Sequence, residues 1–201
     1  SLAPTGTCGR VPTVRPMWPW AHLGVGYLAF GALVRLRVGR VPGDVPALAV
    51  ALGTQAPDLI DKPLGWYLGV LPGGRSLGHS VVVAILGLVL LVVLARHRSR
   101  AVAALAFTVG YLTHLAGDAL DPLISGQPEE LAFLAWPLVP LPSRGDPPTA
   151  LGLVQSIELT PFFTLQFGLA VLGAAVWIGQ GCPGLDPIRG WLGRRALPTG
   201  R

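Results

Sequence analysis

The sequence predicts an all-α protein, an integral membrane helix bundle of about five spans. Of its 201 residues, 51% are hydrophobic and 12% are charged, whereas soluble domains carry about 25% charged residues. The apolar residues also form continuous blocks, separated by short segments rich in glycine, proline and arginine. Since a helix needs roughly 20 apolar residues to cross a bilayer, both observations favour a membrane bundle over a soluble fold.

Five apolar blocks are the candidate spans. The third, fourth and fifth have the length of a spanning helix. The first is adequate if Trp18 and Trp20 anchor it at the membrane interface. The second is short and is expected to be tilted or partly buried in the bundle. In chain order the blocks are Pro19–Leu36, Val45–Ile60, His79–Ala95, Ala101–Leu120 and Ser156–Ile178.

These blocks define one domain, residues 19–178, with no room for a separate soluble module. We expect a flexible N-terminal segment, 1–18, which lacks the continuous apolar stretch of a signal peptide. A basic tail rich in glycine and proline follows at 179–201. The apolar stretch Leu131–Pro142 is too short and too proline-rich to cross. We expect it to be an outer loop, either a lid over the bundle or a plain interfacial segment.

The arginines predict the orientation, because cytoplasmic loops of membrane proteins carry an excess of basic residues. The densest basic run, Arg96–Arg100, separates the third and fourth blocks. Placing it inside also places Arg35, Arg37, Arg40 and the basic tail inside, so ten of the fifteen basic residues are cytoplasmic. The predicted location is the plasma membrane, multi-pass, with the N-terminus outside and the C-terminus inside. The net charge of +5 is therefore assigned to loops beside the bilayer, and no nucleic-acid partner is expected.

This topology brings scattered ionisable residues to one depth, at the outer ends of four helices. Ionisable side chains at membrane depth are costly, so such a group predicts a functional site. Two of these residues, His114 and Asp118, are spaced i, i+4, which places them on one helix face. The group consists of His22, Asp58, Asp61, His79, His114 and Asp118.

Structural roles without a metal are alternative interpretations at several of these positions. A His114–Asp118 contact can be structural, and Asp58 and Asp61 can be solvated acids at a helix exit with Lys62 as their counter-ion. Arg75 follows two glycines and either binds an anionic substrate group through its planar guanidinium or anchors the interface.

Imidazoles and carboxylates without thiolates suit a catalytic divalent ion better than a structural zinc cage. We expect zinc, with manganese or iron as alternatives, and a hydrolytic role in which the ion lowers the pKa of a bound water. An acid outside the ligand set would accept the proton, and Asp61 is our candidate.

Several motifs, taken in order, resemble one family. They are His22 in a tryptophan-rich first helix, Pro57-Asp58-x-x-Asp61, Arg75-x-x-x-His79-Ser80 and His114-x-x-x-Asp118. This set resembles the membrane-bound metal-dependent hydrolases, also described as LexA-binding, inner-membrane-associated hydrolases. The form with Asp61-Lys62-Pro63 is most similar to their haloarchaeal members.

The resemblance covers about His22 to Pro142. It implies that His22, Asp58, His79, His114 and Asp118 bind the metal. Two departures matter. Typical members have histidines where this chain has Lys62 and Gly74, and the loss of two potential ligands favours one ion over two.

The expected function is an integral membrane hydrolase of a lipid-linked or membrane-proximal phosphoester or ester, with Asp61 and Arg75 as its catalytic residues. Two other classes stay open. One is an ion or proton transporter, although its ionisable residues should occur at several depths. The other is a non-catalytic scaffold in which the metal only ties the helices together. The expected partners are the lipid bilayer and the substrate, and the sequence gives no oligomeric state.

Overall fold

The computed structural model describes residues 17–97, 100–142, 152, 155 and 157–186, and every regular element within them is a helix. The predicted all-α class is confirmed. The long helices are α1 (Pro19–Val38), α2 (Asp44–Lys62), α3 (Val81–His97), α4 (Ala101–Ile124) and α6 (Pro161–Gly179). Two short segments complete the order, the π-helix η1 (Pro63–Tyr67) after α2 and the 3-10 helix η2 (Pro128–Ala135) after α4.

The long helices follow the predicted blocks, with differences at their ends. The third begins at Val81 and not at His79, because the Ser80 hydroxyl accepts a hydrogen bond from the Val83 amide in the manner of a helix cap. His79 therefore lies in the turn before α3. The second is longer than predicted, since α2 continues through Pro57 to Lys62. The fifth begins at Pro161, and residue 156 lies outside the described residues.

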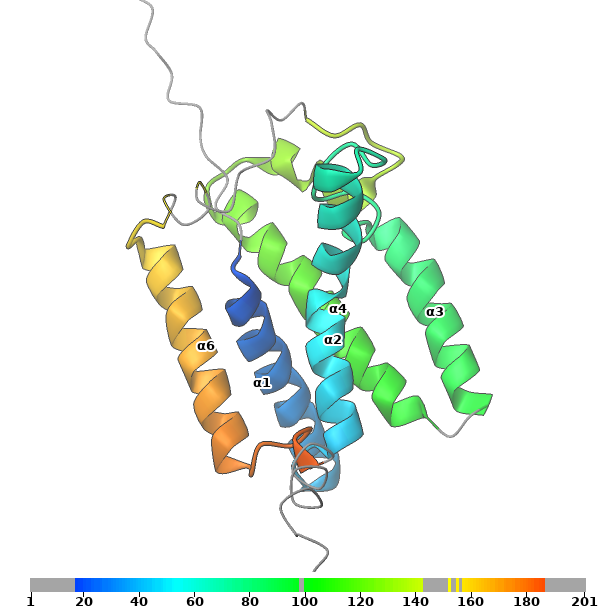
Figure 1. Cartoon of the computed structure of the whole chain (residues 1–201), viewed down its shortest axis with the longest axis vertical. Helices are drawn as coiled ribbons and strands as arrows, with labels where there is room; N and C mark the ends of the chain where they lie inside the picture. The colour runs from blue at the N-terminus through cyan, green and yellow to red at the C-terminus, as the bar shows by residue number, and fades with distance from the viewer. Residues whose placement is uncertain (1–16, 98–99, 143–151, 153–154, 156, 187–201) are drawn as a thin grey trace, which may run out of the picture.

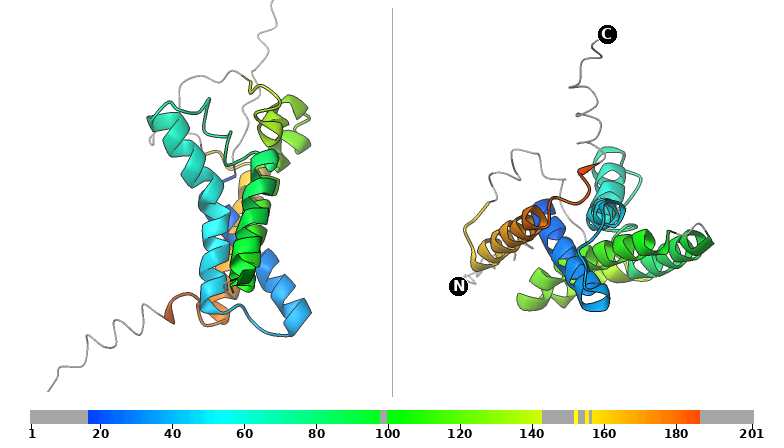
Figure 2. Two further views of the ribbon diagram at one scale, coloured as in Figure 1. Left: turned by 90° about the vertical axis from the view of Figure 1, so that its right-hand side faces the viewer. Right: turned by 90° about the horizontal axis from the view of Figure 1, so that it is seen from below.

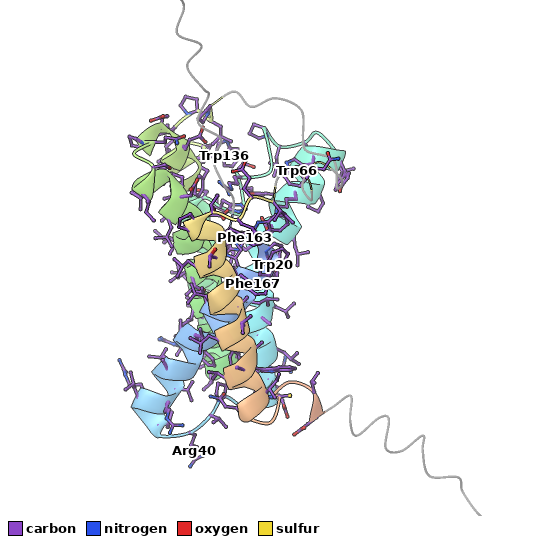
Figure 3. The ribbon with its side chains drawn as sticks, turned by 90° about the vertical axis from the view of Figure 1, so that its left-hand side faces the viewer. Trp20, Arg40, Trp66, Trp136, Phe163 and Phe167 are labelled. Carbon is purple, nitrogen blue, oxygen red and sulfur yellow. The ribbon has the colours of Figure 1, made fainter. Side chains whose placement is uncertain are left out.

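The helices alternate in direction along the chain, so α1 and α6 begin at the end where α2 and α4 finish (Figure 1). We call this end the site end. Helices α1, α2 and α4 pack against one another, α6 packs on α1, and α3 packs on α4. The view from below in Figure 2 places α6 and α3 on opposite sides of the bundle. Arg40 lies at the far end, opposite Trp66 and Trp136 (Figure 3).

Glycines allow α2 and α4 to approach backbone to backbone. A Cβ atom on Gly53 would lie 2.2 Å from the carbonyl oxygen of Phe107. One on Gly110 would lie 2.3 Å from the carbonyl oxygen of Val50. Small residues at helix crossings are typical of bundles in membranes, where close packing replaces the hydrophobic effect as the main attraction.

Among the described helices, only α6 is both long and apolar enough to span a membrane by length and composition. Helix α3 is apolar but shorter. The prediction of about five spans is therefore not confirmed, because α1, α2 and α4 carry more polar residues than this criterion allows.

The segments outside the spans are partly described. Residues 1–16 of the predicted flexible N-terminal segment and residues 187–201 of the basic tail lie outside the described residues. The first part of the tail folds back onto α2, where the Gly184 amide donates to Asp44 Oδ1 at 2.5 Å. The predicted outer loop forms η2 and the turn after it, at the site end (Figure 1).

Candidate metal centre

All the predicted site residues meet at the site end. Helix α1 provides His22, the end of α2 provides Asp58 and Asp61, the turn before α3 provides Arg75 and His79, and α4 provides His114 and Asp118. The three imidazoles are at most 1% exposed. Residues that are scattered over almost a hundred positions thus form one buried cluster.

Asp61 and the turn before α3 hold His79 in one orientation. Asp61 accepts hydrogen bonds from the amides of Ser76 at 2.6 Å, Gly78 at 2.7 Å and His79 at 3.2 Å. His79 Nδ1 donates to the same carboxylate at 2.8 Å. With Nδ1 protonated, the lone pair of the neutral ring is on Nε2, on the far side from Asp61.

His114 is held in the same way by a backbone carbonyl. Its Nδ1 donates to the carbonyl oxygen of Thr54 at 2.6 Å. Pro57 lies inside α2. It lacks the amide hydrogen that would bond the Gly53 carbonyl, and its ring displaces that carbonyl, so the preceding helical turn is loosened. The Thr54 carbonyl belongs to that turn. The neutral His114 ring therefore also presents its lone pair on Nε2.

These two lone pairs face each other, since His114 Nε2 lies 3.1 Å from His79 Nε2. Two carboxylate oxygens border the same space. Asp58 Oδ1 is 3.5 Å from His79 Nε2 and 3.9 Å from His114 Nε2. Asp118 Oδ2 is 3.3 Å and 3.9 Å from the same two atoms. Four acceptor atoms around one point repel one another unless a cation, either a metal ion or a proton, lies between them.

The spacing fits a metal ion. Ligand atoms arranged tetrahedrally around zinc, at bond lengths of about 2.0–2.1 Å, are roughly 3.3 Å apart. The separations that involve the Nε2 atoms of His79 and His114, 3.1 to 3.9 Å, bracket this value. The described residues contain two His/Asp groups able to hold an ion, Asp58–His79–His114 and His22–His114–Asp118.

His22 takes a different position from the other two histidines. Its ring stacks on His114 at 3.8 Å between centroids. Its Nε2 is 3.4 Å from Asp118 Oδ1, the oxygen that points away from His79. Both ring nitrogens of His22 and Asp118 Oδ1 have no hydrogen-bond partner among the described residues. His114 has only one nitrogen free, so it cannot bind two ions at once. A second ion beside His22 would therefore find only two protein ligands.

Two cationic side chains flank the cluster. Lys62 Nζ lies 2.5 Å from Asp58 Oδ2 and Arg75 Nε lies 3.0 Å from Asp118 Oδ2. With neutral imidazoles, the three carboxylates and these two cations give the site a formal charge of −1. A divalent ion changes this to +1, which favours an anionic ligand.

Phe133 of η2 closes the site from above and is fully buried. Its ring meets His79 edge-on at 5.9 Å, and the Arg75 guanidinium lies 5.6 Å from its centre. The Ser80 hydroxyl donates to the carbonyl of Trp136, which attaches this segment to the turn before α3. Of the two interpretations of the outer loop, the structure supports the lid.

Asp61, the predicted proton acceptor, has contacts that favour a different role. Both of its oxygens accept hydrogen bonds from the Ser76–His79 turn, and it lies on the Nδ1 side of His79, away from the space between the Nε2 atoms. These contacts hold the His79 ring in one orientation. The sequence analysis missed Phe133 and the Thr54 carbonyl, a backbone group with no sequence signature of its own.

The family model named YdjM inner membrane protein matches residues 17–182. No curated protein and no solved structure matches the chain. The matched range contains every helix described above and all seven residues of the cluster. It agrees with the family that the motifs resemble.

Proposed function

Because the chain belongs to the YdjM inner membrane protein family, we propose that it is a multi-pass membrane hydrolase with one divalent metal ion at the outer face. The two facing Nε2 atoms, each with its Nδ1 committed to an acceptor, carry this proposal. The predicted ion is zinc, with manganese or iron as alternatives. The orientation follows the basic residues, which place the far end in the cytoplasm.

Four residues are proposed to hold the ion: His79 and His114 through Nε2, Asp58 through Oδ1 and Asp118 through Oδ2. When bound there, a divalent ion supplies a Lewis acid and lowers the pKa of a water molecule that it coordinates. Asp61 and the Thr54 carbonyl fix the orientation of the two imidazoles. Groups that fix metal-binding histidines in this way strengthen metal binding.

Arg75 is proposed to bind the anionic part of the substrate. Its Nε forms an ion pair with Asp118. The two terminal nitrogens, at the outer edge of the guanidinium, are proposed to contact the substrate. The side chain is 13% exposed, so substrate can reach it. A planar guanidinium can bind two oxygens of a phosphate or carboxylate group. Together with the charge of +1 expected for the loaded site, this supports a lipid-linked or membrane-proximal phosphoester or ester as the substrate.

Metal analysis of the detergent-purified protein tests the site. We expect about one equivalent of a transition metal in the wild type and less than a tenth of that in His79→Ala. The matched control is His97→Ala, because His97 ends α3 at the far end of the bundle. Equal metal content in the three proteins, or none in the wild type under zinc, manganese and iron supply, contradicts the proposal.

A closed structural site is the second candidate, and one observation favours it. Four protein ligands complete a tetrahedral zinc site, whereas catalytic sites keep a position open for water. Cobalt-substituted protein separates the two functions. A spectrum that changes on addition of inorganic phosphate indicates an accessible ion and supports the hydrolase; an unchanged four-coordinate spectrum supports the scaffold.

A further inference from the structure

A second feature of the bundle is an apolar groove between α1, α2 and α6, with a volume of about 680 Å³. Its lining includes Trp20 and Leu23 of α1, Leu48 of α2, and Phe167 and Val171 of α6. Four of these side chains are between 40% and 56% exposed, so the groove is open along one side.

The groove begins at the depth of the candidate metal centre. Trp20 lies two residues before His22, and Ala51 on the opposite wall lies three residues before Thr54. In Figure 3, Trp20 lies beside Phe167 in the half of the molecule nearer the site end. From there the lining continues to Trp177, so it extends about 15 Å along α6 at the rise of an α-helix.

The far end of the groove is closed. Pro183, Gly184 and Leu185 cross it in the turn that follows α6. Polar groups of the lining near this end are already bonded: the Tyr27 hydroxyl donates to Gln180 Oε1 at 2.6 Å, and the Trp177 indole donates to the Pro183 carbonyl at 3.0 Å. What remains is an apolar slot whose end at Trp20 lies at the depth of the metal centre.

We propose that this groove binds one hydrocarbon chain of a membrane lipid whose phosphate group lies at the metal centre. The length of about 15 Å equals half of the roughly 30 Å hydrocarbon core of a bilayer, which is the space that one lipid tail occupies. This inference rests on the proposed function. It narrows the proposed substrate from any lipid-linked or membrane-proximal ester to a phospholipid with one or two hydrocarbon chains.

Two pairs of neighbours on α6 provide matched variants. Ala174 lines the groove and Ala175 does not. Val171 lines it and Leu172 does not, although both are 52% exposed. Ala174→Phe fills the groove with a ring, and Val171→Asn makes its wall polar, whereas Ala175→Phe and Leu172→Asn make the same kinds of change outside it.

Native mass spectrometry of the full chain in detergent, titrated with palmitoyl lysophosphatidylglycerol, tests the proposal. We expect one lipid per chain in the wild type and in both controls. Occupancy should fall about tenfold in Ala174→Phe, the effect of displacing two or more methylene groups, and also fall in Val171→Asn. Glycerol phosphate, which has the headgroup but no chain, should bind far more weakly.

Three results overturn the proposal: equal occupancy in all variants, equal binding of glycerol phosphate, or a dimer that only the groove variants abolish, which would make a second copy the occupant. The metal content of the same samples reports separately on the metal centre. Lipid binding without bound metal supports the groove as a lipid site and contradicts the proposed hydrolase. Bound metal without lipid binding supports the metal centre and contradicts the groove as a lipid site.

Discussion

The helices that build the candidate metal centre differ from those at the sides of the bundle in what they bury. Helices α1, α2 and α4 bury imidazoles, carboxylates and glycine contacts against one another. Helices α3 and α6 expose apolar side chains along most of their length, such as Leu86 at 70% and Phe167 at 56%. The ionisable side chains of the site are thus buried between the central helices, and the outer helices present the surface suited to lipid.

Among the described helices, this difference explains why α1, α2 and α4 do not meet the length and composition criterion for a membrane span, which α6 meets. That criterion measures how apolar a helix is as a whole, but a helix inside a bundle needs to be apolar only where it meets lipid. Polar residues within membrane segments usually face the bundle interior. In the proposed multi-pass bundle, the lower hydropathy of α1, α2 and α4 is the expected consequence of carrying a buried site.

The largest predicted effect comes from a substitution that disrupts the packing of α2 against α4. Gly110→Leu places side-chain atoms against the Val50 carbonyl oxygen, 2.3 Å from the added Cβ, and against the Thr54 amide nitrogen, 2.9 Å away. We expect a loss of at least about 3 kcal/mol in unfolding free energy, measured as thermal unfolding in detergent. Gly87→Leu on α3 is the control, since its added Cβ meets no atom within 4 Å. A similar loss in both variants would mean that central and outer helices do not differ in packing.

The second largest predicted effect comes from removing the metal ion. A chelator should lower the thermal stability of the wild type, because binding at 100 times the dissociation constant stabilises a folded protein by about 2.7 kcal/mol. It should not affect His79→Ala. Removal of the metal should leave the stability of α6 relative to the bundle unchanged, which hydrogen exchange of its amides can measure. If the chelator does not change the unfolding temperature of the wild type, the proposal that a metal ion connects the central helices is wrong.

The third effect concerns the orientation of His79. Asp61→Asn replaces one accepting oxygen with an NH₂ group that faces N–H donors, so His79 loses its fixed tautomer. We expect metal affinity to fall about 10- to 100-fold, measured by competition with a colorimetric chelator. Asp44→Asn is the control, because Asp44 accepts the Gly184 amide at the far end of the bundle. If both variants bind metal like the wild type, Asp61 does not orient a ligand.

The sequence predicted the members of the site better than their roles. The i, i+4 spacing of His114 and Asp118 and the alternation of the helices predicted that these residues lie together at one end, as they do. Roles depend on which atom of each side chain faces the shared space, and that depends on backbone groups with no sequence signature of their own. The Thr54 carbonyl and the amides of Ser76 and Gly78 are of this kind.

The bounds of the helices were predictable where composition changes sharply, as at Pro19 and Ala101. They were wrong where a local hydrogen bond decides, as at Ser80, whose hydroxyl caps α3 and leaves His79 in the preceding turn. The groove could not be predicted, because it depends on how far α6 stands from α1 and α2 and on where the chain turns after Gly179.

The smallest predicted effect decides whether His22 is a ligand. His22→Phe keeps the ring that stacks on His114 and removes both unpartnered nitrogens. The unfolding temperature of the metal-free protein should therefore stay the same or rise, because replacing an unsatisfied buried polar group with an apolar one of similar shape is neutral or stabilising. Metal affinity should fall only about tenfold, the lower limit for losing a group next to a ligand, since Asp118 Oδ1 loses His22 while Oδ2 keeps its place beside His79. A loss as large as that of His79→Ala would instead assign the ion to the group His22–His114–Asp118, between α1 and α4 and not at the facing Nε2 atoms.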